Sequence, residues 1–329
     1  MASSRLTHAL ESADLVLPDT GRIALFQPRA DTDLAALPKD RCDVISSFYP
    51  DVAALTAQRF NCVLEPTGSY AAAIVFLPRT RALAETLIAQ ASAAAPGGLV
   101  AVDGLKTDGV EAALRKIRKL VNLAGLDTRS HGKLFWFAAD DLGNDWTQVP
   151  QPQLEGFVTA PGVFSADGID PGSDALAAAL PAKLGAHVVD LGAGWGYLAR
   201  KVLERETVTR IDLVEADHIA LDCARQNVDD ARAQFHWDDA TRWRPDTRAD
   251  SVIMNPPFHT SRTPDPSLGQ AFVATAAACL KPSGQLWMVA NRHLPYEATL
   301  TQYFTSHSEV GGDARFKILH AARPLRQGR

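Results

Sequence analysis

The sequence has few cysteines and no long apolar run, and both absences narrow the class of protein. The chain of 329 residues holds four cysteines, Cys42, Cys62, Cys223 and Cys279, whose spacing matches neither a disulfide framework nor a set of zinc ligands. No apolar run approaches the roughly 18 residues that a membrane-spanning helix needs, and the first residues do not resemble a signal peptide. We therefore expect a protein of the reducing cytoplasm, without a metal and without a membrane partner.

The chain also lacks a large excess of charge of one sign. Its formal net charge is −5 and its isoelectric point is near 6.0. Such a balance excludes a general, sequence-blind coat for nucleic acid, but it permits an enzyme that contacts RNA through local patches. Two groups of basic side chains could form such patches, although a solvated helix face or a loose tail is the alternative for each: Arg115, Lys116, Arg118 and Lys119, and Arg323, Arg326 and Arg329.

Apolar strands alternate with helical patterns along the whole chain, which predicts an α/β protein with parallel sheets. Residues 108–123, for example, predict an amphipathic helix with Asp108 as its cap. Residues 140–162 are rich in Pro, Gly, Gln and Asp, as expected of a linker. We therefore expect two domains, residues 1–145 and residues 146–329.

The two halves follow one plan. Ile74–Pro78, followed by a helix, a Pro-Gly-Gly turn and a strand, matches Val252–Pro256, followed by a helix, Pro-Ser-Gly and a strand. The first copy has Leu77 where the second has Asn255. The strand that ends at Gln27 also lacks a glycine loop. We expect the first domain to be a degenerate, non-catalytic duplicate of the second, with convergent α/β alternation as the alternative.

The segment Asn255–Phe258, Asn-Pro-Pro-Phe, follows an apolar strand and carries the strongest chemical signal. The nitrogen of an amide or aromatic amine is a poor nucleophile because its lone pair is delocalised. The side-chain oxygen of Asn255 and the carbonyl oxygen of Pro256 can each accept an N–H from such an amine and hold it for attack. The prolines stiffen the loop, and Phe258 offers a flat face to a planar substrate. A rigid turn is the alternative.

A second motif lies about 60 residues upstream. There an apolar strand, residues 187–191, runs into a loop with Gly192, Gly194 and Gly196 and then into a helical pattern. Glycines permit a tight turn and close approach to a ligand. The Gly-x-Gly-x-Gly spacing, preceded by Asp190, resembles the loop of class I methyltransferases that binds S-adenosyl-L-methionine (AdoMet). The loop, a following acidic strand end and Asn-Pro-Pro-Phe occur in the order of that class.

With these residues the chain resembles the RsmC/RlmG family of ribosomal RNA guanine-N2 methyltransferases. The resemblance is dense in the second half, where it covers residues 162–174, the glycine loop, residues 255–259, residues 289–296 and residues 315–317. It implies two tandem Rossmann-like methyltransferase domains, of which the first is degenerate. It also implies transfer of a methyl group from AdoMet to the N2 amino group of a guanine, expected in 16S rRNA. The alternatives are 23S rRNA, a protein glutamine amide, DNA adenine, or a non-catalytic RNA-binding module.

The resemblance also assigns roles to residues around the cofactor. Phe164, Ser165, Asp170 and Gly172 are expected to line its methionine end, with a linker or a helix cap as the alternative. The three loop glycines are expected to lie under the amino-acid end.

Three further acids complete the expected cofactor site. Asp190 is expected to help bind the ammonium group of the cofactor. Glu215, at the next strand end, is expected to accept the ribose hydroxyls, with Asp217 as the competing choice. Asp239 is expected to accept the adenine amino group above Ala240, with a plain turn as the alternative.

The acceptor side of the predicted site consists of Asn255, Pro256 and Phe258, and Asn255 also borders the cofactor. Trp195 and Tyr197 are expected to be packing residues, although Trp195 could flank the cofactor. We expect a monomer that acts on ribosomal RNA or on the small ribosomal subunit.

Overall fold

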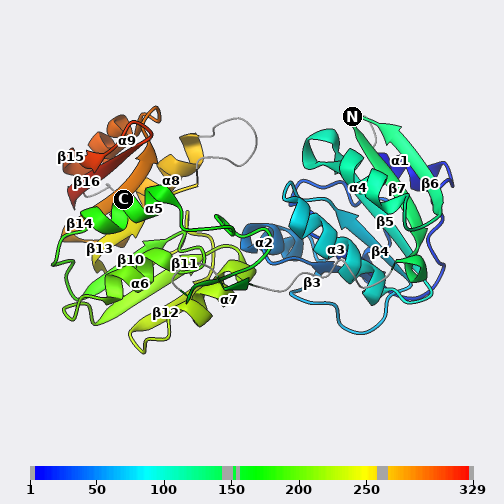
Figure 1. The fold of residues 1–329 in the computed structure, drawn as a ribbon, viewed down its shortest axis with the longest axis horizontal. Coiled ribbons are helices and arrows are strands. Elements are labelled where there is room, and N and C mark those ends of the chain that lie inside the picture. Colours follow the sequence, from blue (N-terminus) through cyan, green and yellow to red (C-terminus); the bar gives the residue numbers. More distant parts are fainter. Residues whose placement is uncertain (1–3, 143–150, 153–155, 258–265, 326–329) are drawn as a thin grey trace. The chain divides into compact units, whose positions relative to one another are not determined.

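The computed structural model describes residues 4–142, 151–152, 156–257 and 266–325. The chain forms two compact units, Met1–Val149 and Pro150–Arg329. Each unit is built around its own seven-stranded sheet (Figure 1). The domain boundary predicted between residues 145 and 146 lies outside the described residues.

The first unit begins with a helix and then alternates strands and helices. Its elements are α1 (Arg5–Glu11), β1 (Ile23–Phe26), β2 (Cys42–Ile45), α2 (Tyr49–Ala57), β3 (Asn61–Val63), β4 (Ala72–Phe76), α3 (Arg81–Ala94), β5 (Leu99–Leu105), α4 (Val110–Ile117), β6 (Leu123–Arg129) and β7 (Gly132–Ala138).

The second unit opens with a short two-stranded sheet and then follows the same alternation. Its elements are β8 (Gln151–Pro152), β9 (Val158–Thr159), α5 (Pro171–Ala179), β10 (His187–Leu191), α6 (Tyr197–Leu203), β11 (Arg210–Glu215), α7 (His218–Asn227), β12 (Ala233–Trp237), β13 (Ala249–Met254), α8 (Pro266–Cys279), β14 (Leu280–Asn291), α9 (Tyr296–Tyr303), β15 (Phe304–Gly312) and β16 (Phe316–Pro324).

The two sheets have the same topology. Their strand orders are β3-β2-β1-β4-β5-β7-β6 and β12-β11-β10-β13-β14-β16-β15. In each sheet five strands are parallel, and the two at one edge pair antiparallel. The predicted α/β fold with two tandem Rossmann-like units is therefore confirmed.

The order of strands determines where a ligand can bind in the second unit. Strands β10 and β13 are parallel neighbours, with Asp190 opposite Ile253. From β10 the chain adds β11 and β12 on one side, and it then returns to add β13 and β14 on the other side. The strand order therefore reverses between β10 and β13. In open α/β sheets the crevice at such a point, outside the carboxyl ends of the strands, is the usual ligand site. The glycine loop follows β10 and Asn255 follows β13, so the fold brings both motifs to this crevice.

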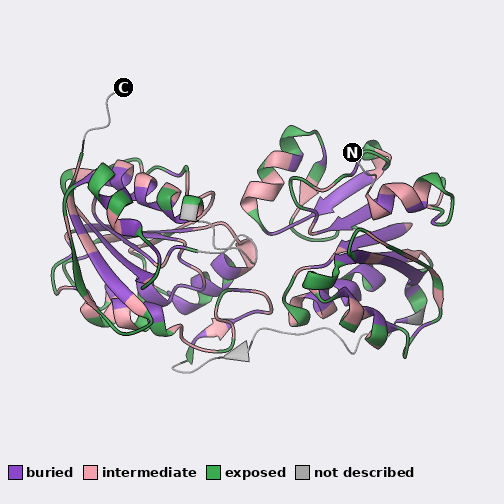
Figure 2. Cartoon of the chain, turned by 90° about the horizontal axis from the view of Figure 1, so that it is seen from above, coloured by how far each residue is buried: buried purple, intermediate pink, exposed green. Residues whose placement is uncertain are grey.

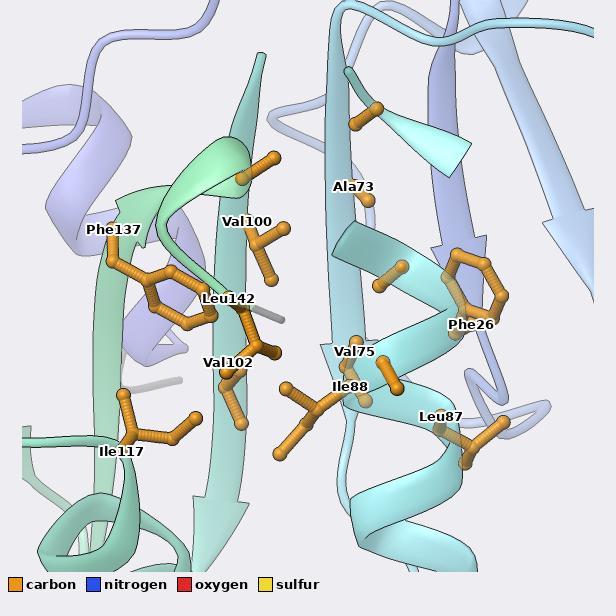
Figure 3. Close-up of a cluster of buried hydrophobic side chains, with 14 of the residues drawn as sticks. Phe26, Ala73, Val75, Leu87, Ile88, Val100, Val102, Ile117, Phe137 and Leu142 are labelled. Atoms are coloured by element: carbon orange, nitrogen blue, oxygen red, sulfur yellow. The ribbon is translucent and has the colours of Figure 1, made fainter. Parts of the chain in front are cut away.

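The strands in the middle of each sheet are buried on both faces, so alternate residues of one strand enter different cores (Figure 2). In β10, Val188 packs with Leu198 of α6, whereas Val189 packs with Val273 of α8. In the first unit, Phe26 and Val75 of neighbouring strands and Ile88 of α3 belong to one buried cluster (Figure 3). Strands buried on both faces are expected to read as continuous apolar runs, and this is why those in the middle of the sheets were predictable.

Some elements differ from the sequence-based expectation. The helix predicted over residues 108–123 covers only Val110–Ile117: it begins after Gly109, whose φ is 82°, and it ends at Ile117, since the chain enters strand β6 at Leu123. Asp108 lies in a short 3-10 turn, where its side chain accepts the backbone N–H of Leu105. The sequence also gave no prediction for α2, β3, β6 or β15. These are short or lie at sheet edges, where one exposed face or a mixed composition weakens the periodic signal.

Candidate cofactor and acceptor site

A small pocket opens at the carboxyl ends of β10 and β13. Six of the predicted site residues line it: Phe164, Ser165, Asp170, Gly192, Gly194 and Asn255. Ser173, Ala193, Trp195, Tyr197 and Leu198 complete the lining. The structure thus brings the glycine loop, the segment before α5 and the Asn-Pro-Pro turn around one cavity.

The three glycines of the loop each have a positive φ, but each is required for a different reason. Gly192, Gly194 and Gly196 have φ values of 75°, 55° and 89°, which residues with a side chain adopt at a cost. A Cβ on Gly196 would lie 2.9 Å from the Val228 side chain, so this glycine permits packing against α7. A Cβ on Gly194 would meet nothing within 4 Å. Gly194 is therefore the glycine that leaves room in the pocket.

The carboxamide of Asn255 is held by hydrogen bonds at the pocket wall. Its Nδ2 donates to Asp170 Oδ2 at 3.0 Å and lies 2.9 Å from Ser173 Oγ. The same Asp170 oxygen accepts the backbone N–H of Ser173 at 2.8 Å and thereby caps α5. Asp170 is thus a helix cap, which was the alternative to a role at the cofactor, and it is also a hydrogen-bond partner of Asn255.

Asp190 is fully buried at the end of β10, and neither carboxyl oxygen makes a hydrogen bond of normal geometry with a described residue, although the backbone N–H of Ala199 is near enough to act against the rise of its pKa. Burial, together with the charge of Glu215, raises the pKa of Asp190 to about 8. A carboxyl without a partner is a costly feature in a folded protein. It has a clear use if a positively charged ligand binds beside it, because the ligand then supplies the missing counter-charge.

Glu215 supports the glycine loop from the end of β11. Its Oε2 accepts the backbone N–H of Gly194 at 2.8 Å, and its Oε1 accepts that of Asp217 at 2.9 Å. Burial raises the pKa of Glu215 above its usual value. Asp217 caps α7 by accepting the N–H of Ile219. Of the two acids considered for the ribose, Glu215 is the one bonded to the glycine loop.

Asp190, Glu215 and Gly196 do not belong to the pocket lining, and neither do the remaining predicted residues that the structure describes. Asp239 forms a turn by accepting the N–H and hydroxyl of Thr241 at 2.9 Å and 2.6 Å. Ala240 is buried in the core on the α8 side of the sheet. Gly172 is buried, and a Cβ there would lie 3.0 Å from Asp170 Oδ2 and 3.3 Å from the Phe316 ring. Pro256 is buried directly after Asn255, whereas Phe258 lies outside the described residues.

Sequence reasoning missed a residue that ties the pocket wall together. The side chain of Asn227, at the end of α7, accepts the N–H of Val158 at 2.6 Å and donates to Val158 O and Trp195 O at 2.8 Å and 2.7 Å. It therefore joins the segment before α5 to the glycine loop. No sequence motif contains Asn227, and its role depends on a contact between segments 69 positions apart.

Aromatic side chains strengthen the same junction. The rings of Phe157, Trp195 and Tyr197 lie within 4.9–5.8 Å of one another. Trp195 Nε1 donates to the carbonyl of Phe164 at 2.9 Å. Trp195 and Tyr197 therefore pack, as the sequence indicated, and they also line the pocket. The ring of Phe164 itself is 57% exposed.

Comparison with known proteins identifies the family. The family of the methyltransferase small domain matches residues 155–320, which is half of the chain. The chain belongs to the methyltransferase small domain family. The match covers the glycine loop, Asn255 and every residue that lines the pocket.

Individual relatives agree with this assignment and with the RsmC/RlmG resemblance, which is confirmed. A ribosomal RNA small subunit methyltransferase C of Pseudomonas aeruginosa is 29% identical over 78% of this chain and 81% of its own length. A ribosomal RNA large subunit methyltransferase G of Shewanella amazonensis is 35% identical, over 49% of this chain and 44% of its own. A solved structure of a Thermus thermophilus 16S rRNA N2 G1207 methyltransferase, RsmC, in complex with AdoMet and guanosine, has a TM-score of 0.80. At 24% identity it covers 97% of this chain and 92% of that one, which shows a common fold.

The pocket of this methyltransferase fits the amino-acid end of AdoMet. The cofactor carries a positive charge on both its sulfonium and its ammonium group, and the partnerless carboxyl of Asp190 lies directly before the glycine loop. The open space at Gly194 gives a ligand access to the loop backbone. The chemistry of these groups therefore agrees with the cofactor of the family.

Other classes of site receive no support from the described part of the chain. No described helix has the length and apolarity to cross a membrane. Within the described ranges, no group of three or more His, Cys, Asp or Glu side chains is arranged to hold a metal ion. The four cysteines are free, and burial raises the pKa of the Cys42, Cys223 and Cys279 thiols to about 11, so these thiols are poor nucleophiles.

Proposed function

We propose that this protein transfers the methyl group of AdoMet to the exocyclic N2 amino group of a guanine in ribosomal RNA. The observation that carries the proposal is the position of Asn255 in the wall of the pocket that also contains Gly192 and Gly194. An amide oxygen that accepts an N–H and a loop that binds the methyl donor are thereby placed within one cavity. Bound AdoMet would supply an electrophilic methyl group on a positively charged sulfur.

The chain's own residues bind and align the two reactants. We assign the ammonium end of the cofactor to Asp190 and the glycine loop, the ribose to Glu215, and the adenine to Asp239 and Ala240. Phe164, Ser165 and Asp170 line the pocket, and we assign them to the methionine end of the cofactor, while Gly172 permits the close packing beside Asp170. These assignments follow the family motif, residue by residue.

The acceptor side positions the amino group of the guanine. The Asn255 side-chain oxygen and the Pro256 carbonyl oxygen are assigned as acceptors of its two N–H groups, and Phe258 as the face on which the base stacks. Alignment and exclusion of water account for most of the catalysis of a direct displacement. A guanine within a helix must be turned out of its stack before it can enter such a pocket.

Small-subunit rRNA is the favoured substrate over large-subunit rRNA. The similarity to the small subunit methyltransferase C of Hahella chejuensis extends over 92% of this chain and 95% of that protein, at 27% identity. The similarity to the large subunit methyltransferase G is confined to about half of each chain. A likeness that includes both units favours the first substrate class. We further propose a monomer that acts in the cytoplasm, where rRNA is modified.

The proposal is tested by methyl transfer from labelled AdoMet to rRNA isolated from cells that lack the gene. We expect label on 16S rRNA and, after digestion, in N2-methylguanosine. Competing acceptors in the same assay separate the alternatives: 23S rRNA, a protein with a glutamine acceptor, and DNA. Label on protein or DNA without label on any rRNA would refute the substrate that we propose.

A further inference from the structure

We infer that Asp170 and Ser173 are positioning residues that fix the orientation of the Asn255 carboxamide. The inference rests on the proposed function, because it concerns the residue that receives the substrate amine. It goes beyond the motif, in which the segment before α5 is expected to touch the cofactor alone. Its basis is the set of hydrogen bonds that join the start of α5 to the turn after β13.

The chemistry of Asp170 decides which way the amide of Asn255 faces. An ionised carboxylate can only accept hydrogen bonds. The Asn255 atom that lies 3.0 Å from Asp170 Oδ2 must therefore be the nitrogen, because an oxygen at that distance would be repelled. The Ser173 hydroxyl, 2.9 Å from the same nitrogen, accepts its second N–H. Both N–H groups of the amide are thus committed to α5.

The orientation of the nitrogen determines that of the oxygen. The two atoms diverge from the same planar carbon, so an amide held by its nitrogen against α5 directs its oxygen away from α5. Donation to a carboxylate also polarises the amide, which makes its oxygen a stronger acceptor. Without these partners the amide could rotate and present its NH2 group to the substrate amine, and two donors would then face each other.

The surroundings of Asp170 keep this arrangement rigid. The carboxylate is fixed by its cap to the Ser173 N–H, and the Ser173 side chain is buried, at 7% exposure. Gly172 lies between them, and a Cβ at this position would come within 3.0 Å of Asp170 Oδ2. The glycine is therefore explained by the network, although it does not line the pocket.

The first experiment compares Ser173→Ala with Ser251→Ala. Ser251 is also buried and its hydroxyl donates to Leu184 O at 2.6 Å, not to Asn255. We expect Ser173→Ala to lower kcat by about 5- to 10-fold, the effect of one lost hydrogen bond, with the calorimetric Kd for AdoMet changed by less than about 3-fold. Ser251→Ala is expected to keep its kcat. Equal effects of the two variants on kcat would contradict the inference.

The second experiment exchanges donor and acceptor between Asp170 and Asn255. Asn255→Asp alone places two carboxylates in contact, so we expect kcat to fall by about 100-fold or more. In the wild type a single oxygen of Asp170 accepts from both Ser173 N–H and Asn255. In the double variant Asp170→Asn/Asn255→Asp, the new amide must therefore turn so that its oxygen caps Ser173 while its nitrogen donates to the new carboxylate, whose other oxygen remains free to accept the substrate amine. We expect kcat at least about 10-fold above that of Asn255→Asp alone.

The exchange separates positioning from capping. Asparagine caps helices as well as aspartate does, so a role of Asp170 in capping alone predicts no recovery in the double variant. No recovery in a double variant that unfolds at the same temperature as Asn255→Asp, and therefore keeps the cap, would overturn the inference. Thermal unfolding of each variant identifies any that fails to fold, and for such a variant the Ser173→Ala comparison decides. The wild-type protein tests the proposed function separately: if it methylates no rRNA the function fails, whereas wild-type activity without recovery refutes only the positioning role.

Discussion

At the scale of the residue, Asp190 has the most unusual environment at the site. Its carboxyl is fully buried, lacks a hydrogen-bond partner among the described residues, and has Glu215 as a charged neighbour. Each of these conditions disfavours the ionised form. We interpret the group as one that stays protonated in the free protein and becomes charged when a cation binds beside it.

This interpretation predicts a pH-dependent stability. The pKa of Asp190 is about 8 in the folded chain and near its usual value of 3.8 in the unfolded chain. Between these values the folded state holds a proton that the unfolded state has released, so stability falls as pH rises, by up to about 1.4 kcal/mol per pH unit. Asp190→Asn removes this pH dependence, because an amide does not titrate. Urea unfolding without AdoMet should show the variant gaining at least about 1 kcal/mol relative to wild type between about pH 5 and pH 8.

If the free energies of unfolding of wild type and Asp190→Asn differ by the same amount at every pH in that range, Asp190 is already ionised in the free protein. The same variant should bind AdoMet more weakly, because it offers no negative charge. Calorimetry in buffers of different ionisation enthalpy provides a second measurement. Wild type should release a proton on binding at about pH 7, and Asp190→Asn should release less.

Asn255 gives the second prediction at this scale. Asn255→Ala removes the acceptor for the substrate amine, whereas the glycine loop stays intact. We expect turnover to fall by about 100- to 1000-fold, as for the loss of a hydrogen-bonding group that acts on the transition state, while the Kd for AdoMet changes little. Methyl transfer to rRNA and calorimetry measure the two quantities. A parallel loss of both would show that Asn255 serves mainly to hold the cofactor.

At the scale of the element, the loop between β10 and α6 separates ligand access from packing. Gly196 lies against Val228 and Ala224 of the next helical segment, at 2.9 Å and 3.2 Å from a Cβ built on it. Gly194 faces open space in the pocket lining, and its N–H donates to Glu215. Two glycines of one motif are thus constrained by different neighbours.

Alanine substitutions at Gly196 and Gly194 should therefore differ in effect: the first should mainly lower stability, and the second should mainly weaken AdoMet binding. Gly196→Ala combines a positive φ with overpacking, and we expect it to cost about 2–4 kcal/mol of unfolding free energy. Gly194→Ala costs about 1 kcal/mol for its φ alone, yet its methyl group would occupy ligand space and should weaken AdoMet binding by about 10-fold or more. Urea denaturation and calorimetry on both variants test the contrast. Equal stability losses would indicate that Gly194 is also closely packed.

At the scale of the whole molecule, the chain holds two sheets of the same topology and a cofactor motif in one of them. The register of the strands shows which residue of the first unit stands at the position of Asp190. Phe26 pairs with Val75 in the first unit as Asp190 pairs with Ile253 in the second. A fully buried phenyl ring, part of the apolar core of the first unit, thus occupies the position of the buried carboxyl (Figure 3). Leu77 correspondingly follows β4 where Asn255 follows β13.

We therefore expect a single AdoMet to bind per chain, at the second unit. Isothermal titration of the full chain should give a stoichiometry near one. Asp190→Asn or Gly194→Ala should weaken all of the binding that is observed, because the first unit offers neither a partnerless carboxyl at this position nor a glycine turn. A second equivalent that survives both substitutions would show that the first unit has a cofactor site of its own.

The sequence by itself determined the α/β class, the duplication and the composition of the two motifs. These depend on local properties: apolar strands buried on both faces, glycines with a positive φ, and an Asn-Pro-Pro turn. The family resemblance, rather than these local properties, identified AdoMet as the cofactor and rRNA as the substrate. Short and edge elements such as α2 and β15 escaped prediction because their periodicity is weak.

The tertiary structure alone decided which side chains meet. Asp170 and Asn255 are 85 positions apart, and Asn227 and Val158 are 69 apart. Nothing local in the chain indicates that a helix cap holds the carboxamide, or that one asparagine joins two walls of the pocket. Such contacts arise because parallel strands place their carboxyl ends at one edge of the sheet, where segments distant in sequence are brought within hydrogen-bonding distance.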